Sequence, residues 1–303
     1  MDCNLLVIIV TYNGSRFIEE CVKSIYFTQN VPDVLIVDNA STDNTVEIVK
    51  LNFPNVNLIV NYENLGFGRA NNIGLKYAID NQYNAVFLLN QDTVIFPDTF
   101  SNLFILFNRL DNVGFVSPVH LDKTMKSLES NFEYFLNKSF KRKLISKMFF
   151  REEGQNYAEI DFVNAAAWLI PVSTLKIVGG FNPIFPHYSE DIDYFNRLKS
   201  FGFKNYIVFN SFIVHYSSNG IADLDFNYSM RRELFERVAI LSNINFSFKY
   251  LFREQLLKFF YNVVIFIYPF QWKKIKFEFF IFFNLIIKIR SIFVSRNISK
   301  KGF

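Results

Sequence analysis

The chain is 303 residues long, half of its residues are apolar, and its formal net charge is +4 at pH 7. This length and composition predict one large domain, or one domain with an appendage, around a sizeable core. The two cysteines, Cys3 and Cys21, exclude a disulfide framework and favour a reduced, cytosolic protein, and the apolar run 5–10 is too short and lacks the basic flank of a secretory signal.

The first half of the chain alternates strand and helix patterns. Short β-rich runs predict strands at residues 5–10, 34–37, 57–60 and 85–89. Helical patterns fall at residues 15–26, from 41 or 42 to about 50, 68–80 and 98–108. This alternation favours an α/β fold with a mostly parallel central sheet and helices on both faces. Ligands of such sheets bind beyond the carboxyl ends of the strands.

The second half is more mixed. We predict strands at 113–116, 166–170, 207–209 and 212–214, and a helix that begins after Ser189 and ends at Gly202. Residues 122–155 are irregular, basic and rich in Phe, and are interpreted as a mobile excursion on the acceptor side.

The composition changes near residue 246. Two apolar, aromatic runs, 256–270 and 277–287, follow, and basic residues flank the second of them. Residues 249–303 carry a net charge of +9 and the rest of the chain −5. We predict an amphipathic helical tail over 246–303 that lies on an anionic membrane surface. The alternatives are a helical cap packed on the preceding domain and a contact in a homo-oligomer. No run reaches the ~18 uninterrupted apolar residues that mark a membrane span.

Three acids stand at the expected start of one helix. Ser189 is predicted to cap this helix, whose first turn holds Glu190, Asp191 and Asp193. The helix dipole favours ionised acids there, and an ionised carboxylate in front of a cleft can act as a general base. The alternative is that these acids serve only as caps. Arg197, four residues after Asp193, can pair with it across one helical turn.

Polar residues follow two of the predicted strands. Asn90, Gln91 and Asp92 come directly after 85–89, where a carboxylate is well placed for a Mg²⁺ or Mn²⁺ ion that bridges phosphates. Asp38 follows the second strand, where an acid can accept hydrogen bonds from a base or ribose. At both places the alternative interpretation is an ordinary turn.

Two further features have weaker signals. Residues 64–74 form a Gly- and Asn-rich entry to a helix, which suits close approach of a phosphate or is an ordinary capped loop. The segment has neither a Walker ending nor the dinucleotide-binding spacing. His215 ends a strand-like run, and it is either a structural histidine or, if Asp92 binds a metal, a second ligand.

Taken in order, these segments resemble the inverting family 2 glycosyltransferases with the GT-A fold, over about residues 4–220. The rhamnosyltransferase-like branch that builds bacterial surface polysaccharides is the most similar in pattern. The motifs are Val10-Thr11-Tyr12-Asn13, Val37-Asp38-Asn39-Ala40-Ser41-Thr42-Asp43, Asn64-x-Gly66, Leu89-Asn90-Gln91-Asp92, Val178-Gly179-Gly180-Phe181, Glu190-Asp191-x-Asp193 and His215.

The resemblance implies a GT-A domain over 1–245, with a nucleotide-sugar-binding half (1–118) and an acceptor half (119–245). It implies that Asp92 and His215 hold Mg²⁺ or Mn²⁺, and that Asp191, beside Glu190, is the base that deprotonates the acceptor hydroxyl. The residues that it implies for the donor, a dTDP- or UDP-sugar, are Thr11, Tyr12, Asn13, Asp38, Asn64, Gly66, Arg69, Asn72, Gln91 and Asp92.

The acceptor implied is a glycan, in particular a lipid-linked one at the inner face of the plasma membrane, and no nucleic-acid partner is expected. Asn90 stands where the family has the first Asp of its Asp-x-Asp motif, so the metal site has one negative charge fewer. The chain also lacks the Gln-x-x-Arg-Trp motif of the processive polymerases, which favours transfer of one sugar at a time.

Two rival functions remain open on the sequence. A nucleotidyltransferase shares the sheet and the metal but needs a basic triphosphate loop, and residues 11–16 offer a single Arg. A membrane-peripheral scaffold that kept the fold and lost activity is consistent with Asn90, whereas Glu190, Asp191 and His215 argue against it.

Overall fold

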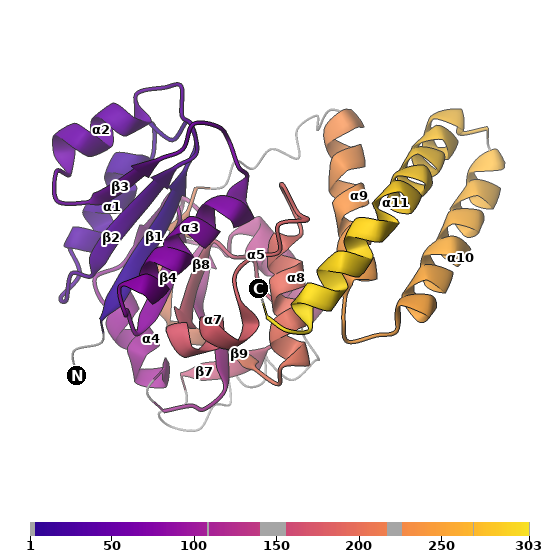
Figure 1. Ribbon diagram of the computed structural model, residues 1–303. Helices are drawn as coiled ribbons and strands as arrows, with labels where there is room; N and C mark the ends of the chain where they lie inside the picture. The colour runs from indigo at the N-terminus through magenta and orange to yellow at the C-terminus, as the bar shows by residue number, and fades with distance from the viewer. Residues whose placement is uncertain (1–3, 108, 140–155, 217–225, 269, 303) are drawn as a thin grey trace.

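The computed structural model describes residues 4–107, 109–139, 156–216, 226–268 and 270–302, and in it an α/β domain is followed by a group of helices (Figure 1). Cys3, residue 269 and residues 140–155 of the predicted excursion lie outside the described residues. The strands are β1 (Leu5–Thr11), β2 (Asp33–Asp38), β3 (Asn57–Val60), β4 (Ala85–Asn90), β5 (Thr93–Ile95), β6 (Val113–Leu121), β7 (Tyr157–Ile160), β8 (Ala167–Pro171) and β9 (Lys204–His215).

Helices lie between these strands and after them. Those of the α/β domain are α1 (Ile18–Tyr26), α2 (Thr45–Asn52), α3 (Phe67–Asp80), α4 (Thr99–Phe107), α5 (Ser130–Ser139), α7 (Val172–Val178) and α8 (Glu190–Ser200). The helices that follow it are α9 (Phe226–Ser242), α10 (Phe248–Ile267) and α11 (Trp272–Ser299).

The described strands form one mixed sheet in the order β3-β2-β1-β4-β8-β6-β9-β5, with β7 also paired to β9. Strands β3, β2, β1 and β4 are parallel, as predicted for the first half of the chain. In the second half β8 runs antiparallel to β4 and β6, and β5 and β7 run antiparallel to β9. The α/β class is therefore confirmed, and the antiparallel pairs come from strands whose order the sequence did not reveal.

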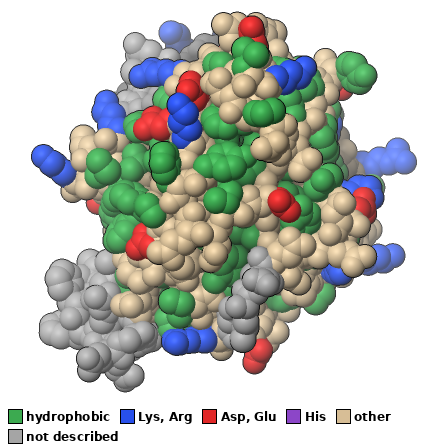
Figure 2. Space-filling model, turned by 90° about the vertical axis from the view of Figure 1, so that its left-hand side faces the viewer, with side chains coloured by type: hydrophobic (Ala, Val, Ile, Leu, Met, Phe, Trp, Pro, Cys, Tyr) green, Lys and Arg blue, Asp and Glu red, His purple; other side chains and the backbone are tan. Residues whose placement is uncertain are grey.

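Helices cover both faces of the sheet. Buried side chains therefore point alternately to the two faces along the strands. In β1, Leu6 and Ile8 face the core with α3, α7 and α8, while Val7 and Ile9 face the core with α1 and α4. Figure 2 shows the side of the domain that is at the left in Figure 1, where acidic and basic side chains are scattered among apolar ones.

A third hydrophobic cluster joins α9, α10 and α11. Arg237 of α9 donates to both oxygens of Glu278 of α11, at 2.8 and 2.9 Å, and both side chains are buried. The predicted division at residue 245 stays a prediction, and the packing groups α9 with the two later helices. Among the described residues, no helix combines the length and the apolar character needed to cross a lipid bilayer.

Two local predictions are corrected. The strands expected at 207–209 and 212–214 are one strand, β9, because its pairing with β6 continues past a register shift. Ser189 precedes α8 but its side chain makes no capping hydrogen bond, since Tyr188 and Ser189 both have left-handed backbones, with φ of 69° and 68°. The helix still begins at Glu190, and Gly202 follows its end with φ of 78°.

Candidate active site

A cavity of about 260 Å³ lies at the carboxyl ends of β1 and β4. Five of the residues that line it belong to the predicted donor site, namely Tyr12, Asn64, Gly66, Gln91 and Asp92. We call it the donor-side cavity. Its other lining residues are Val10, Asn39, Phe67, Asn90 and His187.

Two contacts shape the donor-side cavity. The Gln91 amide accepts from the backbone N–H of Tyr12 (3.0 Å) and donates to the Tyr12 carbonyl (3.1 Å), which fixes the turn after β4 against the end of β1. Gly66 has φ of 83°, and a Cβ at this position would lie 1.7 Å from the carbonyl oxygen of Pro186. Only glycine fits here, because the backbone of Gly66 packs closely against the chain itself. Its predicted close approach to a phosphate stays a prediction.

Asn39 is a residue that the sequence analysis left out of the site. Its side-chain Nδ2 donates to Asn64 Oδ1 (2.9 Å), and its Oδ1 accepts from the backbone N–H of Leu65 (2.9 Å). It therefore holds the entry to α3 beside the end of β2. Asn39 could have been predicted from its position directly after the strand that ends at Asp38.

Three predicted donor residues do not line this cavity, namely Thr11, Asn13 and Asp38. Asp38 is fully buried and accepts hydrogen bonds from Thr11 Oγ1 (2.9 Å) and from the hydroxyl (2.6 Å) and backbone N–H (2.9 Å) of Ser41. Asn13 accepts from the backbone N–H of Thr42 (2.8 Å). The turn that was the alternative interpretation of Asp38 is thus present, and its contact with a nucleotide stays a prediction.

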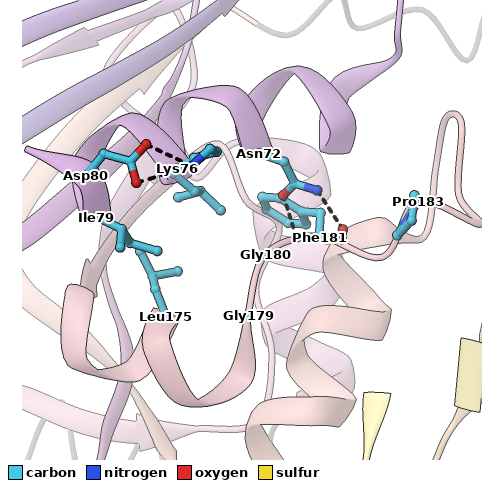
Figure 3. A pocket seen from close by; sticks show the side chains of 10 residues that line it. Asn72, Lys76, Ile79, Asp80, Leu175, Gly179, Gly180, Phe181 and Pro183 are labelled. Atoms are coloured by element: carbon cyan, nitrogen blue, oxygen red, sulfur yellow. Dashed lines mark hydrogen bonds and ion pairs between the residues drawn. The ribbon is translucent and has the colours of Figure 1, made fainter. Parts of the chain in front are cut away.

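Arg69 and Asn72 lie on α3 but point to a different segment. Arg69 Nη2 donates to the carbonyl of Pro183 (2.9 Å), and the Asn72 amide accepts from the N–H (2.7 Å) and donates to the carbonyl (2.8 Å) of Phe181. As Figure 3 shows, Asn72 and Phe181 border a groove of about 390 Å³ between α3 and the region of Leu175. The structure therefore separates these two predicted residues from the donor-side cavity.

Asp92 and His215 come together as predicted, because β5 pairs with the end of β9. His215 Nε2 lies 3.4 Å from Asp92 Oδ1, and His215 Nδ1 lies 3.9 Å from Glu129 Oε2. Burial lowers the pKa of His215, but the carboxylates of Asp92 and Glu129 outweigh it and raise that pKa to about 9. Glu129 was missed, since nothing in the sequence relates it to a histidine 86 positions later.

Glu129 also starts α5. Its carboxylate accepts from the backbone N–H groups of Asn131 (3.0 Å) and Phe132 (2.8 Å), so the helix start fixes its position. His120 lies nearby, stacked on Phe132 with ring centroids 4.3 Å apart, and burial holds its pKa well below the usual value. His215 therefore lies near a neutral His120 and beside a buried Glu129 whose position is fixed.

Within the described residues, no three His, Cys, Asp or Glu side chains converge closely enough to form a metal site by themselves. Two oxygens nevertheless fit a cation whose remaining ligands come from a diphosphate and water. Asp92 is partly exposed, and Asn90 Oδ1 is buried without a hydrogen-bond partner in this part of the chain. Asn90 and Asp92 line the same cavity, and their side-chain oxygens are donors of the kind that Mg²⁺ and Mn²⁺ bind.

A second cavity, of about 240 Å³, lies at the start of α8 and is called the acceptor-side cavity. Glu190 and Asp191 line it, together with Arg232 and Glu236 of α9, whose side chains are 3.2 Å apart. The remaining lining residues are Asn131, Phe135, Asn164, Tyr188, Ser189 and Ile192. Arg232 was not predicted, because it reaches this cavity from a helix beyond the motifs.

The two adjacent acids differ in their partners. Asp191 Oδ1 accepts from the backbone N–H of Ile192 (2.8 Å), whereas Glu190 Oε2 is buried with no hydrogen-bond partner among the described residues. Burial raises the pKa of Asp191 to about 6; burial and the Asp191 charge raise that of Glu190 to about 8. Near neutral pH, Asp191 is the ionised member of the pair and Glu190 keeps its proton.

Asp193, the third acid of the run, is structural. Its Oδ2 lies 2.8 Å from Arg197 Nε, and both side chains are buried, which confirms the predicted pair. Arg197 also donates to the carbonyls of Val178 (2.8 Å) and Gly180 (2.6 Å). The pair therefore ties α8 to the turn after α7, and Glu190 and Asp191 are the acids of the run that line the acceptor-side cavity.

One segment separates the two cavities. His187 lines the donor-side cavity, and the following residues Tyr188 to Asp191 line the acceptor-side cavity. We call residues 187–191 the shared wall.

Comparison with known proteins identifies the family. Residues 6–166 match the sequence model of glycosyl transferase family 2, which covers more than half of the chain. The chain belongs to glycosyl transferase family 2. The matched residues include those of the donor-side cavity from Val10 to Asp92, and end before the shared wall and His215.

Individual proteins that are similar to this chain are also glycosyltransferases. It is 25% identical over 235 residues to an N-acetylglucosaminyl-diphospho-decaprenol L-rhamnosyltransferase of Mycobacterium tuberculosis, an alignment that covers 71% of this chain and 76% of the relative. The structure resembles S. aureus TarS 1-349 in complex with UDP-GlcNAc, with a TM-score of 0.53, 17% identity, and coverage of 85% of this chain and 71% of that one.

GalNAc-T7, solved with UDP, GalNAc and Mn²⁺, is also similar, with a TM-score of 0.57 and 14% identity over 78% of this chain. The chain spans half the length of that structure. These likenesses confirm the GT-A fold of this family 2 chain.

Proposed function

We propose that this family 2 chain is an inverting glycosyltransferase that moves one sugar from a nucleotide-diphosphate donor to a hydroxyl of a lipid-linked glycan, in the synthesis of a bacterial surface polysaccharide. The observation that carries the proposal is the shared wall. Its half-buried carboxylate, Asp191, lines the acceptor-side cavity together with amide and charged side chains, four residues after His187 of the donor-side cavity, and this supports a base close to both substrates.

The donor is a UDP- or dTDP-sugar in the donor-side cavity, between the Gln91 turn and the entry to α3. Two structural neighbours were solved with UDP or UDP-GlcNAc, which supports a nucleotide donor. Asn90 and Asp92 would hold Mg²⁺ or Mn²⁺ there, and His215 would join them as a ligand once the cation displaces the proton of its imidazole. When bound, the cation stabilises negative charge on the departing diphosphate.

The acceptor hydroxyl lies in the acceptor-side cavity, within reach of Asp191. Asp191 takes the hydroxyl proton while the acceptor oxygen bonds to the anomeric carbon, and the bond from that carbon to the diphosphate oxygen breaks. The nucleoside diphosphate leaves from the opposite face, so the configuration inverts. Glu190 stays protonated and keeps the pair at one negative charge, while the amides of Asn131 and Asn164 suit sugar hydroxyls.

The relative from Mycobacterium tuberculosis is named for a lipid-linked diphosphate sugar, which supports an acceptor of that class. Such an acceptor is held in a membrane, and we propose that the enzyme works at the inner face of the plasma membrane.

The pH profile tests the base. We expect the transfer rate to rise with pH through about 6 and then level, because Asp191 acts only when ionised and burial raises its pKa to that value. Glu190→Gln should keep this limb in place, since Glu190 is still protonated at pH 6. A profile that is flat from pH 4.5 to 8 contradicts a base with this pKa.

The cation site is tested through nucleotide binding. We expect Asp92→Ala to weaken nucleoside-diphosphate binding in Mn²⁺ by about tenfold, the lower end of the loss typical when metal ligation is disturbed. Calorimetric titration with and without EDTA measures it, and the variant and the parent should bind equally once EDTA is present. Equal affinities in Mn²⁺ would exclude the metal role of Asp92.

A panel of nucleotide sugars with Mn²⁺ separates the proposal from its rivals. A transferase hydrolyses or transfers from at least one of them, whereas a nucleotidyltransferase releases pyrophosphate from a nucleoside triphosphate. A scaffold does neither.

A further inference from the structure

The hairpin of α10 and α11 is apolar on two sides. Its inner side packs in the third cluster, where Leu251 of α10 and Ile281 and Leu285 of α11 are buried. Its outer side carries a second set of large apolar residues that are exposed. Exposed apolar area of this extent on helices that already have a packed core needs a partner.

On α10 the outer side is a stripe with helical spacing. Tyr250, Leu257, Tyr261, Val264 and Tyr268 are exposed, and they recur at steps of three, four or seven positions. The residues of the buried side, such as Leu251 and Phe259, lie on the opposite face of the same helix.

On α11 the same pattern recurs. Trp272, Phe279, Phe283, Ile287 and Val294 are exposed at steps of four or seven positions. The stripes of α10 and α11 meet at the turn, where Tyr268, Phe270 and Trp272 are 84%, 68% and 60% exposed. We call the two stripes and this turn the outer face.

The outer face is bordered by positive charge. Lys273, Lys274 and Lys276 follow the turn and are exposed, and no described carboxylate lies within ion-pair distance of them. The two acids of the hairpin, Glu254 and Glu278, are paired with Arg253 (3.2 Å) and Arg237 (2.8 Å). The partner of this face therefore combines an apolar interior with negative charge.

The hairpin is fixed to the catalytic domain. Asn182 Nδ2, in the loop before α8, donates to Ser295 Oγ of α11 (2.6 Å). Within the helical group, Arg296 donates to the carbonyls of Leu241 of α9 (2.8 Å) and Phe246 (2.7 Å). Phe185, from the same loop, is buried in the third cluster. The outer face therefore has a set orientation relative to the shared wall.

We propose that the outer face docks on the surface of an anionic phospholipid bilayer, with the aromatic turn in the interface and the lysines on the headgroups; this rests on the proposed lipid-linked acceptor. Aromatic side chains favour the membrane interface, and clustered lysines favour anionic headgroups. A second copy of the chain is a poorer partner, because two such faces carry the same charge.

The orientation fits the reaction. In Figure 1 the turn between α10 and α11 lies at the top of the molecule, and β1 runs upward from the N-terminus, so that its carboxyl end points to the same end. The donor-side cavity, at the carboxyl end of β1, therefore lies toward the same end of the molecule as the hairpin turn. An acceptor anchored in the bilayer can thus reach the site without leaving the bilayer.

The chain carries its own reporter. It has two tryptophans, the buried Trp168 and the exposed Trp272 at the turn. We expect vesicles of phosphatidylglycerol to shift the emission of the full chain to shorter wavelength, and vesicles of phosphatidylcholine to leave it unchanged. In Trp272→Phe the shift should vanish while co-sedimentation with the anionic vesicles persists.

Two sets of variants test the two parts of the face. A triple variant should partition into anionic vesicles about 100-fold less strongly, at roughly a fivefold loss for each lysine near the surface. Its substitutions are Lys273→Gln, Lys274→Gln and Lys276→Gln. The matched control removes three exposed lysines of the catalytic domain and should leave partitioning unchanged. Its substitutions are Lys50→Gln, Lys123→Gln and Lys199→Gln.

For the apolar part, Tyr268→Ser with Phe270→Ser should reduce the Trp272 shift, whereas Phe27→Ser with Leu51→Ser, equally exposed elsewhere, should not. Absence of any shift and of co-sedimentation overturns the proposal. So does a shift that appears without vesicles as protein concentration rises, since it shows that a second copy covers the face. The vesicles contain no glycolipid, so these results stand apart from the transfer assay.

Discussion

Replacement of Asp191 by asparagine is expected to lower the transfer rate by about 10²- to 10⁴-fold, the usual contribution of a positioned general base. Asparagine keeps the shape of the side chain and its place beside the backbone N–H of Ile192, but it cannot take a proton. Nucleotide-sugar binding should be unchanged, because Asp191 lines the acceptor-side cavity and not the donor-side cavity.

Turnover with a saturating acceptor and calorimetric binding of the donor measure the two effects separately. Asp111→Asn, which makes the same chemical change at an exposed turn before β6, is the matched control and should retain full activity. Near-normal turnover in Asp191→Asn would show that the base has been misassigned. A loss of donor binding together with activity would point to a disturbed fold.

The second large effect concerns stability. We expect Asp193→Ala to lower the free energy of unfolding by about 3–5 kcal/mol, because it leaves the guanidinium of Arg197 buried without its carboxylate. The alanine also removes the acceptor of the Asn182 amide (3.2 Å), a contact that helps to join α8 to α11. Urea unfolding followed by circular dichroism measures the change.

An exposed pair gives the control. Asp80→Ala breaks the ion pair with Lys76 on α3, which has the same spacing and distance but is solvent-accessible, and should change the free energy of unfolding by no more than about 0.5 kcal/mol. Combining Asp193→Leu with Arg197→Met should recover much of the lost stability, since no buried charge remains. Equal effects of Asp193→Ala and Asp80→Ala would mean that the buried pair is not what holds the start of α8.

The sequence was sufficient to predict part of the lining of the donor-side cavity, because several of these residues follow strand ends. Parallel strands bring their carboxyl ends to one edge, so Tyr12 and Gln91, which follow β1 and β4, had to lie near each other once the strands were recognised. The pairing of Asp193 with Arg197 was equally local, since four positions make one helical turn. Both predictions needed only periodicity and the direction of the chain.

The contacts that it missed are long-range. Glu129 reaches His215 because β6 pairs with β9 and delivers α5 to that point, a pairing that no local pattern reveals. Asn72 lies on the predicted helix, but spacing along a helix does not say that its amide will bind Phe181. For both residues, the sequence indicates the chemistry of the side chain but not the residue that it contacts.

Ser189 failed as a side-chain cap for a related reason. The loop before it is fixed at two places, at Gly66 by the carbonyl of Pro186 and in the third cluster by Phe185. With its path set, the chain turns into α8 through two left-handed residues, Tyr188 and Ser189, and the serine hydroxyl does not reach the helix. Tertiary contacts thus overrode a sound local preference.

The shared wall has a consequence for the order in which substrates bind. Because His187 lines the donor-side cavity and the next four residues line the acceptor-side cavity, a shift of this segment on donor binding would change the affinity for the acceptor. Thermodynamic reciprocity then requires the acceptor to change the affinity for the donor by the same factor. With such a shift, the two half-sites of this transferase would be linked equilibria, and a single short stretch of backbone would be the element that couples them.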